Sequence, residues 1–321
     1  MTAASRLMPP PISTHLRQIN LRQDIGKIAD LVEICFADRL DDDGRGYIRQ
    51  MRAAAANPSM VGTMGSFVHT MRGYVWEEAG KLIGNINLLP VSAGGERACL
   101  IVNVAVHPDH RRRGIARALT EKSLAYIRGR GYSSSWLQVD ADNTSAQALY
   151  TSFGFSEQAR RTTWHSSGKS QAVRSDFLVQ SHRSADWELQ KEWLERLYPP
   201  RLHWHLRIKT KLLQPGFSGM IARMTSDIRV RQWSAFKNGQ LVGTASWEST
   251  NSQADWLWLA TDSEWEEGAV LSLLQHARGA LRPGRTVAVN YPAGRAGQAF
   301  EQAGFHPHQT LIWMQIRFAE G

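Results

Sequence analysis

The chain has 321 residues and a formal net charge of +9, and no run of apolar residues is long enough to span a bilayer. Hydrophobic residues make up 42% and charged residues 21%, which excludes a disordered chain and leaves room for two domains. The two cysteines, Cys35 and Cys99, lie in apolar sequence and are expected to be buried free thiols of a cytoplasmic protein.

Strand-like and helix-like periodicities alternate along the N-terminal half. Residues 1–14 lack an apolar core and are expected to form a flexible tail. The predicted elements are, in chain order, a strand at 15–21, helices at 24–36 and 47–55, strands at 74–77, 81–89 and 98–106, a helix at 114–128, a strand at 136–139 and a helix at 145–153. Gly154 stands where a glycine commonly ends a helix.

The C-terminal half repeats this order. Three ordered matches carry the repeat: Gly80–Gly84 with Gly239–Gly243, Gly114–Ala116 with Gly268–Val270, and Gly154–Phe155 with Gly304–Phe305. The offset falls from 159 to 154 to 150, as expected if the second copy has shorter loops. We therefore predict a tandem duplication, with domains at 15–170 and 171–321 and a turn or linker at 166–170.

The segment from Val104 to Ala116 predicts a phosphate-binding loop. It reads as a strand end, a tight loop with Arg111, Arg112 and Arg113, and the start of a helix at Gly114. Unpaired backbone N–H groups and the helix dipole favour an anion there, and neighbouring arginines add charge-assisted contacts. The pattern alone is equally consistent with a basic surface loop before an ordinary helix.

Two motifs together resemble the GNAT family of N-acetyltransferases. The first is the strand ending in Val-His-Pro, followed by Arg-x-x-Gly-x-Ala and an amphipathic helix, which is similar to that family's acyl-CoA-binding motif. The second is Asn143-x-x-Ala146-x-x-Leu149-Tyr150-x-x-x-Gly154-Phe155, about thirty residues later. The resemblance covers roughly residues 15–165; in the second half it is recognisable only as fold.

The resemblance implies a fold and a cofactor. Each half is expected to be an α/β domain with a mixed, mostly antiparallel sheet flanked by helices, in which two strands splay apart to admit the pantetheine arm of acetyl-CoA. The expected cofactor-binding residues are Ala105 and Val106 at the strand end, Arg111, Arg112, Arg113, Gly114, Ile115 and Ala116 in the loop, and Asn143. Tyr150 is expected to donate a proton to the departing thiolate, because a phenol is a neutral donor at pH 7.

A general base for the amine is not evident. Asn103 stands on the strand where some relatives place a glutamate, and an amide cannot accept a proton. Asp140, Asp142 and His107 could serve, although the two aspartates could equally be solvated loop acids.

The second half departs from the motifs at each chemical position. By the offsets above, Arg112, Arg113 and Ala116 become Glu266, Glu267 and Val270, whereas Asn143 and Tyr150 become Ala293 and Phe300. Two carboxylates would repel a pyrophosphate, and phenylalanine lacks the hydroxyl proton that tyrosine could donate. We expect residues 171–321 to keep the fold without the catalysis.

Nine of the twelve tryptophans lie after residue 170. Alternation places Trp256 and Trp258 on one face of a strand, in a packed core, a contact between domains, or an aromatic acceptor pocket. The His-x-His pairs at 203–205 and 306–308 lack a third ligand, so no metal site is predicted.

The prediction is an acetyl-CoA-dependent N-acetyltransferase with a small-molecule or peptide amine as acceptor and with the two domains in contact. The alternative is a non-catalytic acyl-CoA sensor or scaffold. No membrane partner is expected, and scattered positive charge without an aromatic-basic motif disfavours nucleic acid.

Overall fold

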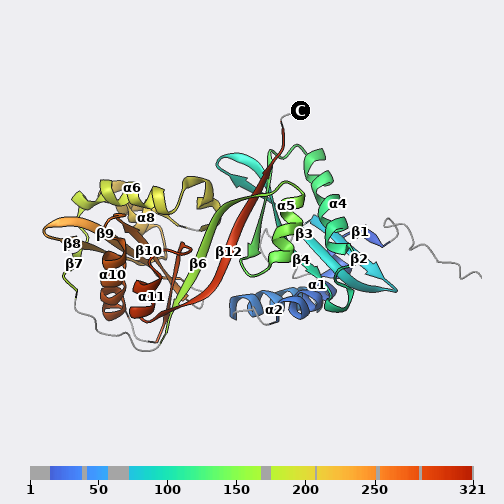
Figure 1. The fold of residues 1–321 in the computed structure, drawn as a ribbon, viewed down its shortest axis with the longest axis horizontal. Helices are drawn as coiled ribbons and strands as arrows, with labels where there is room; N and C mark the ends of the chain where they lie inside the picture. Colours follow the sequence, from blue (N-terminus) through green and yellow to red (C-terminus); the bar gives the residue numbers. More distant parts are fainter. Residues whose placement is uncertain are drawn as a thin grey trace, which may run out of the picture. The chain divides into compact units, whose positions relative to one another are not determined.

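The computed structural model describes residues 15–37, 42–56, 72–167, 175–206, 208–250, 254–281 and 284–319. The chain divides into two compact units (Figure 1). Unit 1 takes in Met1–Gln138, Ser145–Ser156 and Met314–Gly321, and unit 2 takes in Val139–Thr144 and Glu157–Trp313. The predicted tail at 1–14 and most of the predicted linker at 166–170 lie outside the described residues.

Unit 1 contains the elements expected of the N-terminal half, most of them longer than predicted. They are β1 (Leu16–Gln18), α1 (Leu21–Phe36), α2 (Asp42–Ala56), β2 (Arg72–Glu78), β3 (Lys81–Ala93), β4 (Glu96–Val106), a 3-10 turn (Pro108–His110), α4 (Ile115–Gly129), β5 (Ser134–Asp140) and α5 (Thr144–Ser152). The first strand is shorter than predicted because the carbonyl of Asn20 already accepts hydrogen bonds from the amides of Gln23 and Asp24, which start α1.

Helices cover both faces of the unit 1 sheet. Gly84 and Asn85 are neighbours on β3 and therefore point to opposite faces. A Cβ atom on Gly84 would lie 2.8 Å from Cγ2 of Ile115 and 3.1 Å from Cδ1 of Leu119, so α4 packs closely on that face. Asn85 pairs with Val75, which belongs to a buried apolar cluster with side chains of α1 and α2.

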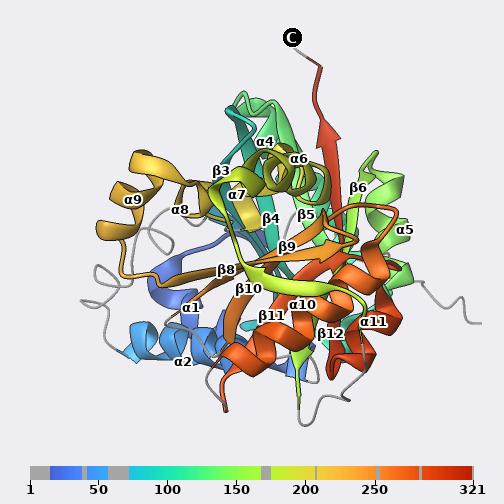
Figure 2. The same ribbon diagram turned by 90° about the vertical axis from the view of Figure 1, so that its left-hand side faces the viewer.

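Unit 2 repeats this architecture. Its elements are β6 (Ser156–Ser166), β7 (Leu178–Ser181), a 3-10 turn (Ser184–Asp186), α6 (Trp187–Leu197), a 3-10 turn (Pro200–Leu202), α7 (His203–Leu206), α8 (Thr210–Leu213), α9 (Gly216–Met224), β8 (Val230–Lys237), β9 (Gln240–Glu248), β10 (Ala254–Thr261), α10 (Glu266–Ala280), β11 (Thr286–Pro292), α11 (Gly297–Gln302) and β12 (Phe305–Arg317). Figure 2 shows α10 and α11 on one side of the strands and α6 on the other.

The sheets are mixed and mostly antiparallel, as predicted. In unit 1 the strand order is β1-β2-β3-β4-β5, followed by the end of β12; in unit 2 it is β12-β6-β11-β10-β9-β8-β7. The pairs β4–β5 and β10–β11 are parallel. Both units therefore have the expected α/β sheet flanked by helices.

The compact units do not follow a single border at residue 170. Residues 157–167, the last strand of the predicted N-terminal domain, belong to unit 2, where β6 pairs with β11. The end of β12 belongs instead to unit 1, where the amide of Phe318 donates to the carbonyl of Ser133 at 2.9 Å. Each copy thus gives a terminal strand segment to the other unit, and local sequence patterns carry no signal for this exchange.

The internal repeat is visible in the backbone. Ala79 and Gly80 turn the β2–β3 hairpin with φ of 48° and 77°, and Asn238 and Gly239 turn β8–β9 with 51° and 81°. A Cβ atom on Gly243 would lie 3.2 Å from both Ala269 and Leu273, so α10 packs on β9 as α4 packs on β3. No helix among the described residues combines the length and apolar character needed to cross a membrane.

Candidate functional site

The loop predicted to bind phosphate lies between β4 and α4. The amide of His107 donates to the carbonyl of Ile83 at 2.9 Å, which fixes the end of β4. Gly114 is the N-cap of α4, with φ of 80°, and a Cβ atom there would meet nothing within 4 Å. The left-handed backbone explains the glycine, and the open space lets a ligand approach the N-terminal amides of α4.

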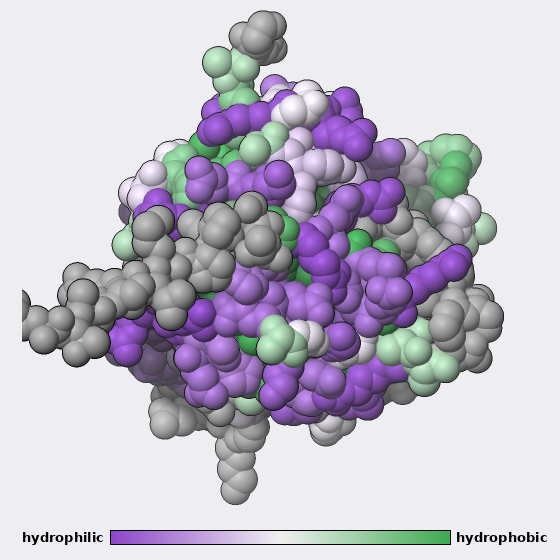
Figure 3. Space-filling view, turned by 90° about the vertical axis from the view of Figure 1, so that its right-hand side faces the viewer, coloured by the Kyte–Doolittle hydropathy of each residue, from purple (hydrophilic) through white to green (hydrophobic). Residues whose placement is uncertain are grey.

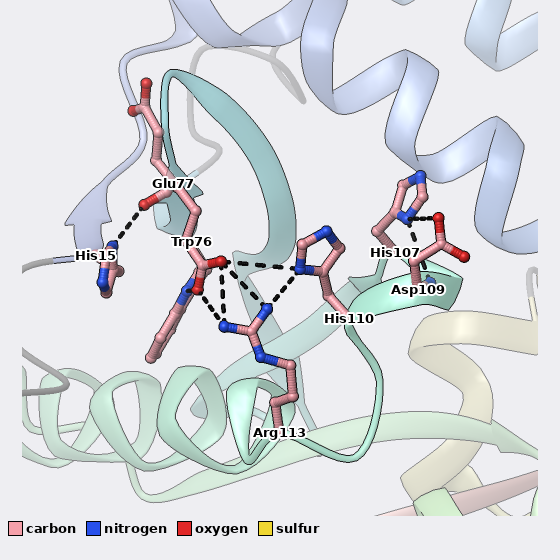
Figure 4. A network of polar contacts seen from close by, with 8 residues as sticks. His15, Trp76, Glu77, His107, Asp109, His110 and Arg113 are labelled. Atoms are coloured by element: carbon pink, nitrogen blue, oxygen red, sulfur yellow. Dashed lines mark hydrogen bonds and ion pairs between the residues drawn. The ribbon is translucent and has the colours of Figure 1, made fainter. Parts of the chain in front are cut away.

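The three loop arginines have different surroundings. Arg113 donates to both carboxylate oxygens of Glu78 at 2.9–3.2 Å and contacts His110 at 2.6 Å (Figure 4). Hydrogen bonds from Trp76 and then Arg113 lower the pKa of Glu78. Arg112 has φ of 61° and, among the described residues, its exposed guanidinium has no hydrogen-bond or ion-pair partner. Arg112 is therefore the arginine most available to an incoming anion.

The end of β4 carries Ala105 and Val106. The carbonyl of Val106 accepts a hydrogen bond from Nε of Arg111 and another from the thiol of Cys35, both at 3.3 Å. Burial raises the pKa of the Cys35 thiol and raises that of Cys99 to about 12, so neither is a thiolate at neutral pH. Both cysteines are free.

A bulge bends β4 just before these residues. The β3–β4 register shifts between Asn85 and Asn87, and Asn103 has φ of 51°. The side-chain amide of Asn85 donates to the carbonyl of Asn103 at 2.9 Å and stabilises this conformation. The ladder between β4 and β5 ends at the pair Ile101–Leu137, although β4 continues to Val106. The last residues of β4 are thus not paired with β5.

Tyr150 lies on α5 with 5% of its surface exposed, and its ring contacts Phe155 edge to face at 6.0 Å. Burial raises the pKa of Tyr150 to about 12. Its hydroxyl has no hydrogen-bond partner within the described part of the chain. Arg117 in the first turn of α4 donates to Ser152 at 3.0 Å, so the structure brings α5 next to the start of α4.

The other predicted residues serve the turn before α5. The amide of Asn143 donates to the carbonyl of Asp140 at 3.0 Å, and the amide of Asp142 donates to the Asp140 carboxylate at 2.9 Å. Asp140 thus has a structural role in this turn. The ring of His107 accepts a hydrogen bond from the amide of Asp109 at 3.4 Å (Figure 4).

The sequence indicated no role for Glu78 or His110. Glu78 lies 35 residues from Arg113, and their contact depends on the β2–β3 hairpin packing beside the loop. A lone acid in a strand gives no signal that could have identified it.

The sequence profile of the acetyltransferase (GNAT) family matches residues 35–155, which contain this loop and Tyr150. Over these residues, the chain is similar to the GNAT family. The bS18-alanine N-acetyltransferase of Escherichia coli is 42% identical over 65 residues, 20% of this chain and 44% of that protein. Mycothiol acetyltransferase of Thermobispora bispora is 38% identical over 86 residues, 26% of this chain and 29% of that protein. The chain therefore aligns with less than half the length of these relatives.

A likeness of fold extends over both units. The crystal structure of a GCN5-related N-acetyltransferase from Sphaerobacter thermophilus matches with a TM-score of 0.56 and 17% identity, over 95% of this chain and 96% of that one. Unit 2 therefore lies within a match to the GNAT fold, and its helix start can be compared with the loop of unit 1.

In unit 2 the start of α10 is already occupied by side chains of the same unit. Glu266 accepts a hydrogen bond from the Tyr291 hydroxyl at 2.5 Å and pairs with Arg295 at 2.8 Å. Glu267 accepts one from the amide of Ala299 at 2.8 Å. A Cβ atom on Gly268 would lie 2.4 Å from the ring of Phe177, which covers the helix start.

The β10 strand of unit 2 is also occupied. By the register Gly84–Val106 and Gly243–Thr261, Thr261 corresponds to Val106. The amide of Leu259 donates to the hydroxyl of Tyr198 at 3.3 Å, and the carbonyl of Thr261 accepts a hydrogen bond from Arg196. The β9–β10 ladder runs from Trp256 to Thr261 without a register shift, so β10 lacks the bulge of β4.

Proposed function

We propose that the chain is an N-acetyltransferase that binds acetyl-CoA in unit 1 and transfers its acetyl group directly to an amine. The α4 N-terminus at Gly114–Ala116, with Arg112 exposed beside it, would receive the pyrophosphate. The end of β4, where Ala105 and Val106 pair with β3 but not with β5, would receive the pantetheine arm.

The reaction forms one C–N bond and breaks one C–S bond. The neutral amine attacks the thioester carbonyl, the sulfur leaves as a thiolate, and the proton of the attacking nitrogen passes to solvent. The Tyr150 hydroxyl would protonate the sulfur, and the resulting tyrosinate would regain a proton from solvent. The Tyr150 pKa of about 12 keeps the phenol protonated at neutral pH. Full transfer to a thiolate of pKa ~8.5 would be uphill by about 5 kcal/mol, so we expect the proton to move late, after a hydrogen bond to the sulfur has formed.

The observation that carries this proposal is the Tyr150 hydroxyl, which has no hydrogen-bond partner among the described residues and lies on a helix tied to the start of α4 by Arg117 and Ser152. The hydroxyl of a buried tyrosine with a purely structural role usually has a hydrogen-bond partner. Unit 2 supports the assignment by contrast, since Phe300 stands at the equivalent position and stacks on Trp164 at 4.6 Å.

The test compares wild type with Tyr150→Phe while thiol release from acetyl-CoA is followed. The amine panel includes a peptide with an N-terminal alanine, because one relative is named for such an acceptor, together with lysine amide and small diamines. We expect kcat to fall by about 100-fold or more with KM for acetyl-CoA little changed. Tyr74→Phe, a matched change on β2, should retain full activity.

The alternative is a non-catalytic acyl-CoA sensor. It would be favoured if acetyl-CoA binds tightly but no amine accelerates thiol release. Turnover of Tyr150→Phe at the wild-type rate would instead remove Tyr150 from the mechanism while leaving the acetyltransferase activity in place.

A further inference from the structure

Four exposed arginines gather at the end of unit 1 where α4 ends. Three of them lie over aromatic rings: Arg97 over Tyr132 at 5.1 Å, Arg128 over Phe318 at 5.1 Å and Arg130 over Tyr126 at 5.3 Å. The fourth is Arg317, at the end of β12. Figure 3 shows that the face of unit 1 turned to the viewer is largely hydrophilic.

The backbone holds these side chains in one place. The amide of Ser133 donates to the carbonyl of Arg97 at 3.0 Å, and the carbonyl of Ser133 accepts a hydrogen bond from the amide of Phe318 at 2.9 Å. The starts of β4 and β5 and the end of β12 are thus joined side by side. The arginine–aromatic cluster is therefore built by tertiary structure from segments far apart in sequence.

Part of the cluster lines a hollow of about 560 Å³, within the range of small-ligand pockets. The hollow is lined by Arg128, Gly131, Tyr132, Ser133, Arg317, Phe318 and Ala319. It offers two cationic groups, the rings of Tyr132 and Phe318, and the Ser133 hydroxyl.

The described part of unit 1 does not neutralise the charge of the cluster. None of the four arginines has an ion-pair partner among the residues that the structure describes. Other arginines of unit 1 are paired with acids, as Arg17 is with Asp24 at 2.7 Å and Arg52 with Asp30 at 2.7 Å. One carboxylate, Glu96, contacts the lining by accepting a hydrogen bond from Ser133 at 3.2 Å.

From this geometry we infer that the arginine–aromatic hollow binds a nucleotide, either free or within a single strand of nucleic acid. Unpaired guanidinium groups bind phosphate, and guanidinium planes and aromatic rings stack on bases. A duplex hides its bases and would gain only the phosphate contacts. A purely inorganic anion would make no use of the rings.

The hollow is distinct from the proposed cofactor loop. The loop lies before Ile115 and the hollow lies around Arg128, at opposite ends of α4. At 1.5 Å per residue, the 15 residues of α4 span about 21 Å from the first to the last. Acetyl-CoA bound at the loop should therefore leave the hollow open.

The experiment measures binding of a fluorescein-labelled ten-nucleotide oligouridylate by fluorescence anisotropy, with saturating CoA present. The variant is Arg128→Ala/Arg317→Ala, and the control is Arg22→Ala/Arg49→Ala, which removes the same charge from exposed positions on α1 and α2. We expect the first variant to weaken binding by about 10–100-fold and the control by less than about twofold. The slope of log affinity against log salt should fall by about 1.4 in the first variant only.

Competition with AMP separates the two sources of the ligand. AMP is added at a concentration equal to that of the nucleotides in the strand. If AMP displaces the strand, the ligand is a free nucleotide; if the strand stays bound, the ligand is a single strand. Both outcomes support nucleotide binding in the hollow. The inference is overturned if the strand does not bind, if both variants weaken binding equally, if a duplex binds as well as the single strand, or if CoA displaces the strand. Thermal melting shows whether each variant remains folded. Because the readout is binding with CoA present, failure here would leave the proposed acetyltransferase activity untouched.

Discussion

Units 1 and 2 share a β-hairpin (β2–β3 and β8–β9) with a glycine against which a helix packs. They differ at the start of that helix, which carries arginines in unit 1 and glutamates in unit 2. In unit 1, Gly114 opens α4 towards empty space, with Arg112 exposed beside it. In unit 2, Glu266 and Glu267 bind partners within the unit, and Phe177 covers Gly268. The packing that defines the fold is thus independent of the groups that define a ligand site, and one can persist without the other.

The contrast continues along the neighbouring strands. The bulge at Asn103 interrupts the β3–β4 ladder, whereas the β9–β10 ladder is continuous. In unit 2 the hydroxyl of Tyr198 and the side chain of Arg196 bind the backbone groups of Leu259 and Thr261. The carbonyls of Val106 and Thr261 both accept hydrogen bonds within their own units, so the contrast lies in the strand geometry and in the Leu259 amide, which is bound by Tyr198.

Reversing the charge of the unit 1 loop should give the largest effect. Arg112→Glu/Arg113→Glu makes the loop resemble unit 2 and should weaken acetyl-CoA binding by about 100-fold or more, because each like-charge contact costs about 1–4 kcal/mol. Titration of acetyl-CoA by calorimetry measures the change. The control Arg22→Glu/Arg49→Glu carries the same charge change and should bind normally. Equal weakening in both variants would show that net charge, not the loop, holds the cofactor.

Alanine at the paired glycines tests the part that the units share. A Cβ atom would lie 2.8 Å from α4 at Gly84 and 3.2 Å from α10 at Gly243. We expect each substitution to lower the free energy of unfolding by about 1–3 kcal/mol, with Gly84→Ala the more costly. Chemical denaturation of each variant provides the measurement. If one of the two substitutions left the free energy of unfolding unchanged, α4 and α10 would not pack alike on their strands.

The smallest effect concerns pH. Since the folded pKa of Tyr150 is raised to about 12, the phenol stays protonated as pH rises through the ordinary tyrosine range. The rate of acetyl transfer should therefore show no loss attributable to Tyr150 between pH 8 and 10. A decline in that range that disappears in Tyr150→Phe would contradict the raised pKa.

Local sequence patterns predicted most of the fold and the shared parts of both units. Apolar periodicity located the helices of the N-terminal half but not α6 to α9, and the glycine matches revealed the repeat, because turns and close packing require glycine at fixed positions. The strand exchange of β6 and β12 was not predicted, since pairing between distant segments leaves no periodic signal.

The candidate site was only partly readable from the sequence. The loop and Tyr150 lie in short motifs, but the Glu78–Arg113 pair joins residues 35 positions apart. The arginine–aromatic hollow shows the same limit, because Arg97, Tyr132 and Phe318 meet only through the sheet. The expectation against nucleic acid rested on the scattered positive charge and on the lack of a contiguous aromatic-basic motif in the sequence.

The stoichiometry of acetyl-CoA binding tests the central claim most directly. Calorimetric titration of the full chain should give one acetyl-CoA per chain, and Arg112→Glu/Arg113→Glu should abolish that single binding event. Two equivalents per chain, or one equivalent that survives the loop substitutions, would contradict the assignment of the cofactor to unit 1 and of a closed site to unit 2.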